Sequence, residues 1–365
     1  MRQVLLRIPL NLTVPLFGHP VPVFGFGLLL GAWLGLCAFW AYQHLRRRSF
    51  DSELQAQLVF QAFVSLIIWK LPSLTPDINI FGYGAAMVCG FLAAAWLAGE
   101  RAKREGIDPA IIWDIGMWVL LSGVLGARLF YIIKNPQNFF GPKMPLQQTL
   151  FEFINLTKGG LVLYGGVLLG IATFIWQCHR LRLSALKLAD ILIPAIFVGE
   201  MFGRIGCFLN GCCFGDPTTL PWAVQFPPGS VPFDAEVAAG VIKKDALCSL
   251  PLHPAQIYSS INALILAVIT WNYYPHRKRD GSVLLMGWIL YPITRFFLEV
   301  VRGDTPGEFG TSFTIAQWVS FGMLLCAIGF GGYLSTRPKL PPRELPGPEP
   351  AVPPNPAAAT TGPRK

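Results

Sequence analysis

Charged residues are scarce in this sequence. Only 13% of its 365 residues are Asp, Glu, Lys or Arg, whereas soluble domains average about 25%. Hydrophobic residues make up 53% of the chain. The formal net charge of +9 lies in short loops between apolar runs, which argues against a nucleic-acid-binding surface. The composition excludes an ordinary soluble domain and predicts a protein that crosses a membrane several times.

Nine apolar stretches, each bounded by charge, Pro or Gly, predict membrane-spanning helices. We therefore expect an all-α polytopic membrane protein. The run at 57–71 is shorter than the ~20 residues that a spanning helix needs, so an interfacial position is the alternative for it. The nine segments lie near 21–42, 57–71, 78–98, 112–133, 160–177, 188–203, 256–274, 282–299 and 314–334.

Four basic loops, each with three Lys or Arg, set the expected orientation. The positive-inside rule places such loops in the cytoplasm, and all four share that side only if the 57–71 segment crosses. Nine crossings then leave the N-terminus outside and the C-terminus in the cytoplasm. The basic loops are 44–48, 100–105, 179–187 and 275–280, and the loops expected outside are 134–159, 203–255 and 300–313.

One internal repeat divides the chain. The stretch at 23–48 resembles the stretch at 80–105, since each begins F-G-aromatic-G and ends in basic residues. We interpret residues 1–77 as extra membrane segments that duplicate the first core helix, and 78–335 as the core. The Pro-rich end at 336–365 lacks aromatic residues and predicts a disordered cytoplasmic tail.

Three arginines lie inside or at the outer ends of predicted helices: Arg128, Arg204 and Arg295. A charge in a bilayer normally faces a cavity or a partner. Arg295 stands four residues before Glu299 and can pair with it, which is the structural alternative for that arginine. We expect no carboxylate partner for the other two. Because guanidinium holds phosphate bidentately, the three arginines predict a phosphate site.

Paired glycines support a site at the same face. Gly165 and Gly166 follow Tyr164 at the start of a predicted helix, and four more glycines surround Arg204. Glycine lets a ligand or another backbone approach closely. The alternative for these glycines is helix packing through small residues.

Several motifs occur in the order typical of one bacterial enzyme family. The segment GRIGCFLNGCCFG, from Gly203 to Gly215, resembles the signature of the phosphatidylglycerol–prolipoprotein diacylglyceryl transferases. The resemblance covers about 78–334 and keeps the family's order and spacing. The other matching segments are YG at 83–84, GARLFY at 126–131, YGGVLLG at 164–170, HPAQIY at 253–258, YPITRFFLEVVR at 291–302 and AQWVS at 316–320.

The resemblance implies a seven-helix core in the bacterial inner membrane, with its N-terminus outside and its C-terminus in the cytoplasm. The family moves a diacylglyceryl group from phosphatidylglycerol to the lipobox cysteine thiol of a prolipoprotein signal peptide, and glycerol 1-phosphate leaves. It needs no cofactor. The implied partners are phosphatidylglycerol, the prolipoprotein and membrane lipids, with no nucleic acid.

The same resemblance assigns the candidate site. Cleavage of a carbon–oxygen bond builds charge on the departing phosphate, which pre-aimed arginines stabilise best where water is scarce. The expected catalytic residues are Arg204, Arg295, Tyr164 and Tyr291. The expected phosphatidylglycerol-binding residues are Arg204, Tyr83, Arg128, Gly165, Gly166, Asn210, Gln256, Tyr258 and Glu299.

Three positions depart from the family pattern. Tyr164 stands where the family has a histidine that is proposed to take the proton of the thiol. Tyrosine is a poor base at neutral pH, because its hydroxyl ionises only near pH 10. Cys207 and Cys212 stand where the signature has Asn and Glu. These departures indicate a divergent member, in which the phosphate or Tyr291 takes the proton, or a member with altered activity.

Four cysteines lie in the predicted outer loop: Cys207, Cys212, Cys213 and Cys248. They lack the two closely spaced pairs of a zinc site, so we expect no metal. An oxidising exterior favours disulfides, and four cysteines allow three pairings. We prefer a bond from Cys212 or Cys213 to Cys248.

Two other function classes are compatible with buried arginines. An anion or lipid-headgroup transporter also uses broken helices, but it predicts a repeat that relates the two halves, which the sequence does not show. A non-catalytic membrane scaffold predicts loss of Arg204 and Arg295, and both are present. The sequence therefore favours the transferase.

Overall fold

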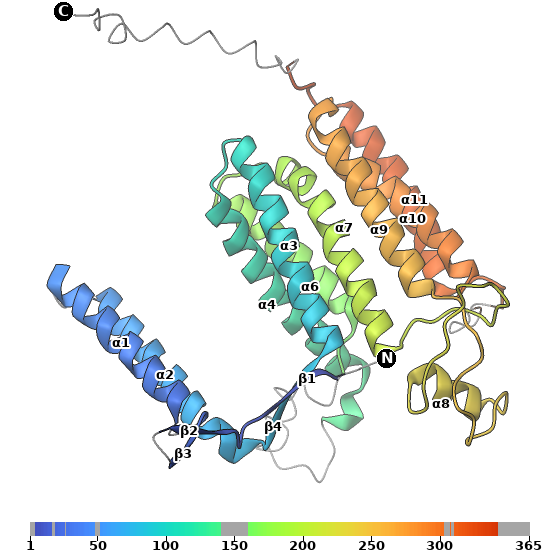
Figure 1. Cartoon of the computed structure of the whole chain (residues 1–365). Coiled ribbons are helices and arrows are strands. Elements are labelled where there is room, and N and C mark those ends of the chain that lie inside the picture. The colour runs from blue at the N-terminus through green and yellow to red at the C-terminus, as the bar shows by residue number, and fades with distance from the viewer. Residues whose placement is uncertain are drawn as a thin grey trace, which may run out of the picture. The chain divides into compact units, whose positions relative to one another are not determined.

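The computed structural model describes residues 4–16, 19–25, 27–47, 52–139, 160–302, 307 and 310–341. Helices dominate this part of the chain (Figure 1). They are α1 Leu28–Arg47, α2 Ser52–Leu74, α3 Gly82–Arg104, α4 Pro109–Lys134, α6 Leu163–Arg180, α7 Ala185–Asn210, α8 Val231–Ala238, α9 Ala255–Tyr273, α10 Ser282–Val300 and α11 Ile315–Ser335. The strands are β1 Val4–Pro9, β2 Thr13–Leu16, β3 His19–Pro22 and β4 Asp77–Phe81.

The expected all-α membrane fold is confirmed, since a helix occupies each of the nine predicted segments. In the described part of the chain, α3, α4, α7, α10 and α11 are long and apolar enough to cross a membrane. The protein is therefore a multi-pass membrane protein. Helix α2 has a shorter apolar stretch, Gln57–Ser73, and its crossing stays a prediction, as do those of α1, α6 and α9.

The chain divides into two compact units. Unit 1 comprises Met1–Ala94, Val198–Leu264 and Phe297–Thr314. Unit 2 comprises Ala95–Phe197, Ile265–Phe296 and Ile315–Lys365. Helices α3, α7, α9 and α10 each contribute residues to both units. Most of the loop predicted at 134–159 and the tail beyond residue 341 lie outside the described residues.

Two small antiparallel sheets in unit 1 correct the predicted helix starts. β1 pairs with β4, with Pro9 opposite Asp77, and β2 pairs with β3. The predicted helices at 21–42 and 78–98 therefore begin later, at Leu28 and Gly82. Proline supplies no backbone N–H and within sheets is confined to edge strands, which fits the place of the Pro-rich stretch His19–Pro22 in a two-stranded sheet.

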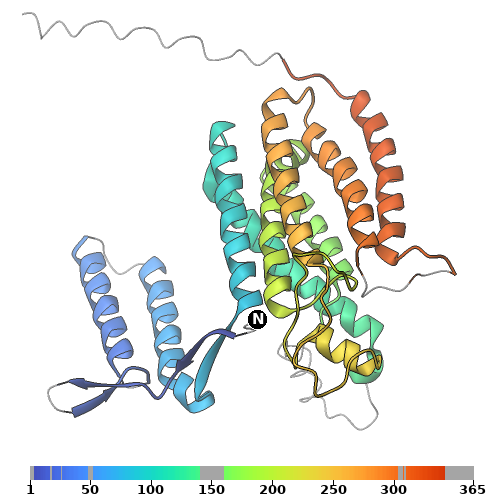
Figure 2. The same ribbon diagram turned by 45° about the vertical axis from the view of Figure 1, so that its right-hand side comes forward.

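An ion pair and a helical hairpin complete the N-terminal part of unit 1. Arg7 Nε donates to Asp77 Oδ2 at 2.9 Å, which joins β1 to β4. Helices α1 and α2 lie side by side, as both Figure 1 and Figure 2 show. Each copy of the F-G-aromatic-G repeat lies where a strand ends and a helix begins, which is consistent with a duplicated unit. The predicted domain boundary after residue 77, however, falls within the β1–β4 sheet.

Glycines let α4 and α6 approach closely in unit 2. A Cβ atom on Gly165 would overlap the carbonyl oxygen of Gly126, and one on Gly166 would lie 2.9 Å from the carbonyl oxygen of Gly123. Small residues permit such backbone contact between membrane helices. Gly165 and Gly166 therefore have a packing role, the alternative that their sequence left open.

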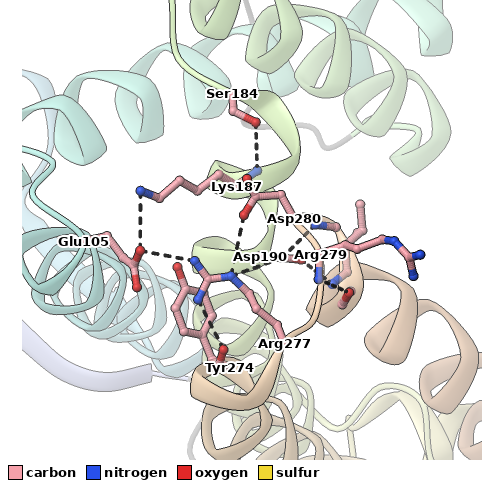
Figure 3. A network of polar contacts seen from close by, with 11 residues as sticks. Glu105, Ser184, Lys187, Asp190, Tyr274, Arg277, Arg279 and Asp280 are labelled. Carbon is pink, nitrogen blue, oxygen red and sulfur yellow. Dashed lines mark hydrogen bonds and ion pairs between the residues drawn. The ribbon is translucent and has the colours of Figure 1, made fainter. Parts of the chain in front are cut away.

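Three of the four basic loops meet in one polar cluster of unit 2 (Figure 3). Arg277 pairs with Glu105 at 3.2 Å, and Lys187 pairs with the same carboxylate at 3.4 Å. Asp190 is fully buried and accepts the backbone N–H groups of Gly281 and Leu284 at the start of α10. The loops 100–105, 179–187 and 275–280 therefore lie together, as their predicted shared side requires, whereas their place in the cytoplasm stays a prediction.

Candidate functional site

Arg204 lies near the end of α7 and pairs with Glu200. The Nη2–Oε1 distance is 3.2 Å, and the two side chains are only 18% and 22% exposed. The expectation that Arg204 lacks a carboxylate partner was wrong. The i,i+4 spacing of Glu200 and Arg204 on one helix face was the available signal. The pair orients a cation that is largely shielded from solvent.

The Asn-Gly of the signature stops α7. Gly211 has a φ of 79°, and its N–H donates to the Phe208 carbonyl at 3.2 Å. The Cys212 N–H donates to the Cys207 carbonyl at 3.1 Å. This pair of bonds, with a left-handed glycine just past the helix, is a Schellman motif. It turns the chain sharply after Asn210, three residues beyond Cys207.

Gly215 joins three of the motif segments within unit 1. Its N–H donates to the His253 carbonyl at 3.0 Å, and Asp216 N–H donates to the Val301 carbonyl at 3.1 Å. A Cβ atom on Gly215 would lie 2.6 Å from the His253 Cβ and 2.7 Å from the Val301 oxygen. Only glycine fits there, so the signature is fastened to the HPAQIY segment and to the chain that follows α10.

Glu299 is buried at this junction. Its carboxylate lies 3.7 Å from the Arg302 guanidinium and accepts a hydrogen bond from the Thr314 hydroxyl at 3.1 Å. These contacts hold the end of α10, and with it the end of the YPITRFFLEVVR motif, against the segment that leads into α11. The pairing of Glu299 with Arg295 stays a prediction.

Gln256, one of the expected phosphatidylglycerol-binding residues, is buried. Its Nε2 donates to the Cys212 carbonyl at 2.8 Å, which braces the signature turn. Its Oε1 is buried and has no partner among the described residues, so it is available to a hydroxyl donor. The Tyr258 hydroxyl accepts from Trp222 Nε1 at 2.6 Å and lies 3.3 Å from His253 Nδ1.

Tyr83 lies at the start of α3, where α3 packs on α7 within unit 1. A Cβ atom on Gly206 would lie 3.1 Å from the Tyr83 ring, so the glycine gives the ring its space. Tyr83 itself is 42% exposed. It packs on Gly206, two residues after Arg204 in α7, which keeps it among the candidate substrate contacts.

The cysteines of the signature form a cluster. The Sγ atoms of Cys207, Cys212 and Cys213 all lie within 4.8 Å of one another. All three are free thiols, and so is Cys248, so the preferred disulfide to Cys248 was wrong. Hydrogen bonds from the other two thiols, with a contribution from Asn210, lower the pKa of Cys212. The helix-ending turn explains the cluster, because it folds Cys212 back toward Cys207.

Arg128 lies in unit 2 and is buried. Its Nη1 donates to the Gly160 carbonyl at 3.0 Å, and its guanidinium lies 5.4 Å from the Tyr131 and Phe139 ring centres. Gly160 is left-handed with a φ of 83°. Arg128 therefore holds the segment that enters α6, and a direct phosphate contact stays a prediction.

The remaining candidates also lie in unit 2. Tyr164 occupies the first turn of α6 and is 54% exposed, so its side chain is accessible to lipid or substrate. Tyr291 and Arg295 lie one turn apart on α10 and are partly buried. The Tyr291 ring packs against Phe197, with ring centres 6.1 Å apart.

A family model described as prolipoprotein diacylglyceryl transferase matches residues 67–333. The chain belongs to this family. Proteins named phosphatidylglycerol–prolipoprotein diacylglyceryl transferase are among its relatives. The one from Clostridium tetani is 32% identical over 251 residues, which is 69% of this chain and 92% of the relative. The one from Rhodopirellula baltica is 26% identical over 420 residues and covers 84% of this chain and 85% of the relative.

Membership in this family makes the protein a transferase of lipoprotein biosynthesis, as the sequence resemblance predicted. The comparisons give no support to a transporter or a scaffold. The family match begins at residue 67, inside α2, which is earlier than the predicted start of the core.

Sequence reasoning missed three residues of the described site: Glu200, Trp222 and Arg302. Glu200 was readable from its spacing to Arg204. Arg302 was readable in the same way, from its i,i+3 spacing to Glu299. Trp222 donates to Tyr258, 36 residues away in the chain, and nothing in its local sequence indicates that contact.

Proposed function

We propose that this chain transfers the diacylglyceryl group of phosphatidylglycerol to the lipobox cysteine thiol of prolipoprotein signal peptides. The family match over residues 67–333 carries this proposal. It is supported by the position of Arg204 in the family signature, where the Glu200 carboxylate orients a shielded guanidinium.

The reaction explains why the site needs fixed cations. The cysteine sulfur attacks a glycerol carbon of the lipid, the carbon–oxygen bond breaks, and its electron pair goes to the phosphate oxygen of glycerol 1-phosphate. Arg204 and Arg295 stabilise the charge that develops on this phosphate. The thiol must lose its proton, since the thiolate is the nucleophile. The proton passes to the departing phosphate, while Tyr164 and Tyr291 orient the substrate.

The other candidates position these groups. Gln256 and Asn210 brace the turn after Arg204, and the buried Gln256 Oε1 is available to a hydroxyl of the lipid headgroup. Tyr83, Tyr258 and Glu299 shape the same part of unit 1 as headgroup or peptide contacts. Arg128, Gly165 and Gly166 hold the start of α6, which presents Tyr164.

The protein acts in the bacterial inner membrane, with its N-terminus outside and its C-terminus in the cytoplasm. The basic loops that meet around Arg277 support this orientation because such loops stay in the cytoplasm. A reporter fusion tests the location of the C-terminus. A fluorescent protein fused after residue 341 is expected to fluoresce, because it folds in the cytoplasm. The same fusion would stay dark if the C-terminus were exported through the Sec pathway.

Complementation tests the function. In a strain depleted of its own transferase, the wild-type chain restores growth, and mass spectrometry of a model lipoprotein shows the added diacylglyceryl mass. Arg204→Ala and Arg295→Ala remain in the membrane but lose transfer, whereas Arg104→Ala, at an exposed ion pair, keeps it. An unmodified lipoprotein with well-expressed wild-type protein contradicts the proposal, and wild-type rates in both arginine variants contradict the phosphate assignment.

A further inference from the structure

Three thiols at the end of α7 have no role in the proposed transfer, because the reacting thiol belongs to the substrate. Cys207 lies in the last turn of the helix, and Cys212 and Cys213 follow in the turn after it. Their Sγ atoms lie within 4.8 Å of one another, and each residue is partly buried. Three sulfur atoms at this separation can reach one ion between them with small side-chain rotations.

The backbone holds this arrangement in place. The Schellman bond from Cys212 N–H to the Cys207 carbonyl fixes the first two cysteines relative to each other. Gln256, which is buried, donates to the Cys212 carbonyl from another helix. Cys213 has a φ of 60°, a left-handed conformation that a non-glycine residue rarely adopts. The strained residue directs its sulfur to the same side as the other two.

The donor set selects the class of ion. Among the described residues, the group consists of three cysteines, with no His, Asp or Glu among its members. Structural zinc sites use four ligands, and magnesium and calcium prefer oxygen. Thiolates select copper(I), zinc(II) and iron–sulfur clusters, and a group of three thiolates fits copper(I), the softest of these, better than zinc(II), which takes four ligands in structural sites.

We propose that Cys207, Cys212 and Cys213 bind one copper(I) ion through three thiolates. Each thiol that binds the ion releases its proton to solvent. Copper stays in the +1 state and the sulfurs stay thiolates, so no oxidant or reductant is needed. The ion ties the signature turn to α7 just beyond Arg204, whose positive charge lies one helical turn before Cys207 and offsets part of the charge of the three thiolates.

The test is an anaerobic titration of the purified full chain in detergent with copper(I), in competition with a chromophoric copper(I) chelator. The wild type withdraws one equivalent from the chelator. Cys207→Ser, Cys212→Ser and Cys213→Ser each withdraw much less, whereas Cys248→Ser, a partly buried thiol outside the group, matches the wild type. Equal uptake by the wild type and the three cluster variants overturns the proposal.

A second measurement keeps the proposal testable if the serine variants fold poorly. X-ray absorption at the copper edge of the loaded wild type is expected to show three sulfur neighbours. Nitrogen or oxygen neighbours, retention of zinc(II) in preference to copper(I), or a disulfide within the cluster after anaerobic purification each overturn the proposal. None of these readouts depends on transferase activity, so failure here leaves the proposed function untouched, and failure of complementation leaves the copper site untouched.

Discussion

At the scale of single residues, the ion pair of Arg204 and Glu200 decides how the site holds its charge before substrate arrives. A largely buried arginine without a carboxylate would carry a desolvation cost. Glu200 offsets that cost and fixes the guanidinium of Arg204, which lies between Gly203 and Gly206 of the signature. The phosphate of the lipid then finds an oriented cation.

Replacing Glu200 with Gln is expected to make stability depend on the lipid. The variant keeps an acceptor for Arg204 but removes the negative charge beside this largely buried cation, which costs about 1–3 kcal/mol of unfolding free energy. Phosphatidylglycerol restores that stability because its phosphate supplies the missing charge. Thermal unfolding in detergent, with and without the lipid, measures the effect.

The control for this prediction is diacylglycerol, which lacks the phosphate and is expected to restore nothing. If phosphatidylglycerol stabilises the Glu200→Gln variant no more than the wild type, Arg204 does not meet the phosphate.

Tyr164→Phe separates the two roles open to the exposed Tyr164 hydroxyl. If the hydroxyl only positions substrate, the variant loses one hydrogen bond of about 1–3 kcal/mol, which lowers the rate about tenfold to a hundredfold. General-base catalysis contributes about 10²–10⁴-fold, so the rate alone does not decide. We expect the pH profile of the transfer rate to stay parallel to that of the wild type. Loss of one ionisation from the profile would identify Tyr164 as the base.

At the scale of elements, the β1–β4 sheet links the N-terminal extension to the first core helix. The Leu10 N–H donates to the Pro76 carbonyl at 2.9 Å, so the end of β1 lies beside the beginning of β4. Helices α1 and α2 and the β2–β3 sheet lie between those ends in the chain. A short turn can therefore replace them without separating β1 from β4.

Replacing residues 11–76 with Asn-Gly-Thr is expected to give a stable, active transferase, with Thr in place of Pro76 because the turn needs a backbone N–H at that position. Asn-Gly favours the type I′ turn of a two-residue hairpin, so β1 keeps its partner and α3 keeps its start. Deleting residues 1–77 instead removes β1 and the Arg7–Asp77 pair, and we expect it to be less stable. Complementation and thermal unfolding compare the two. A well-folded but inactive hairpin variant would show that α1 and α2 belong to the site.

At the scale of the whole molecule, the basic loops do more than set orientation. Arg277 lies within 4.0 Å of three carboxylates: Glu105 at 3.2 Å, Asp280 at 3.6 Å and Asp190 at 3.9 Å. Figure 3 shows its guanidinium between these side chains. The loops after α3, before α7 and before α10 are thereby joined at one side of the membrane.

Arg277→Ala is expected to destabilise the protein by about 3–5 kcal/mol, because it removes the cation that faces the buried carboxylates of Asp190 and Glu105, although Lys187 still pairs with Glu105. The matched control is Arg104→Ala, whose ion pair with Glu100 is exposed and contributes at most about 1 kcal/mol. Thermal unfolding in detergent measures both. Equal stability of the two variants would show that the Arg277 cluster does not stabilise the fold.

The sequence by itself determined the helices, the shared side of three basic loops and the family. These features are local: apolar runs of sufficient length form helices in lipid whatever surrounds them, and loop charge sets topology without tertiary contacts. The candidate arginines were found for the same reason, since a charge in an apolar run is conspicuous wherever it packs.

Only the tertiary structure decided how distant residues meet. The β1–β4 pairing joins strands about 70 residues apart. Asp190 accepts hydrogen bonds from the N–H groups of Gly281 and Leu284, 91 and 94 residues later, at the start of α10. The sequence favoured a disulfide from Cys212 or Cys213 to Cys248. In the structure, the turn after α7 instead brings the thiols of Cys207, Cys212 and Cys213 together. Such contacts form between segments that are far apart in the chain. Neither segment's own sequence shows which partner it packs against, so only the folded structure reveals the contact.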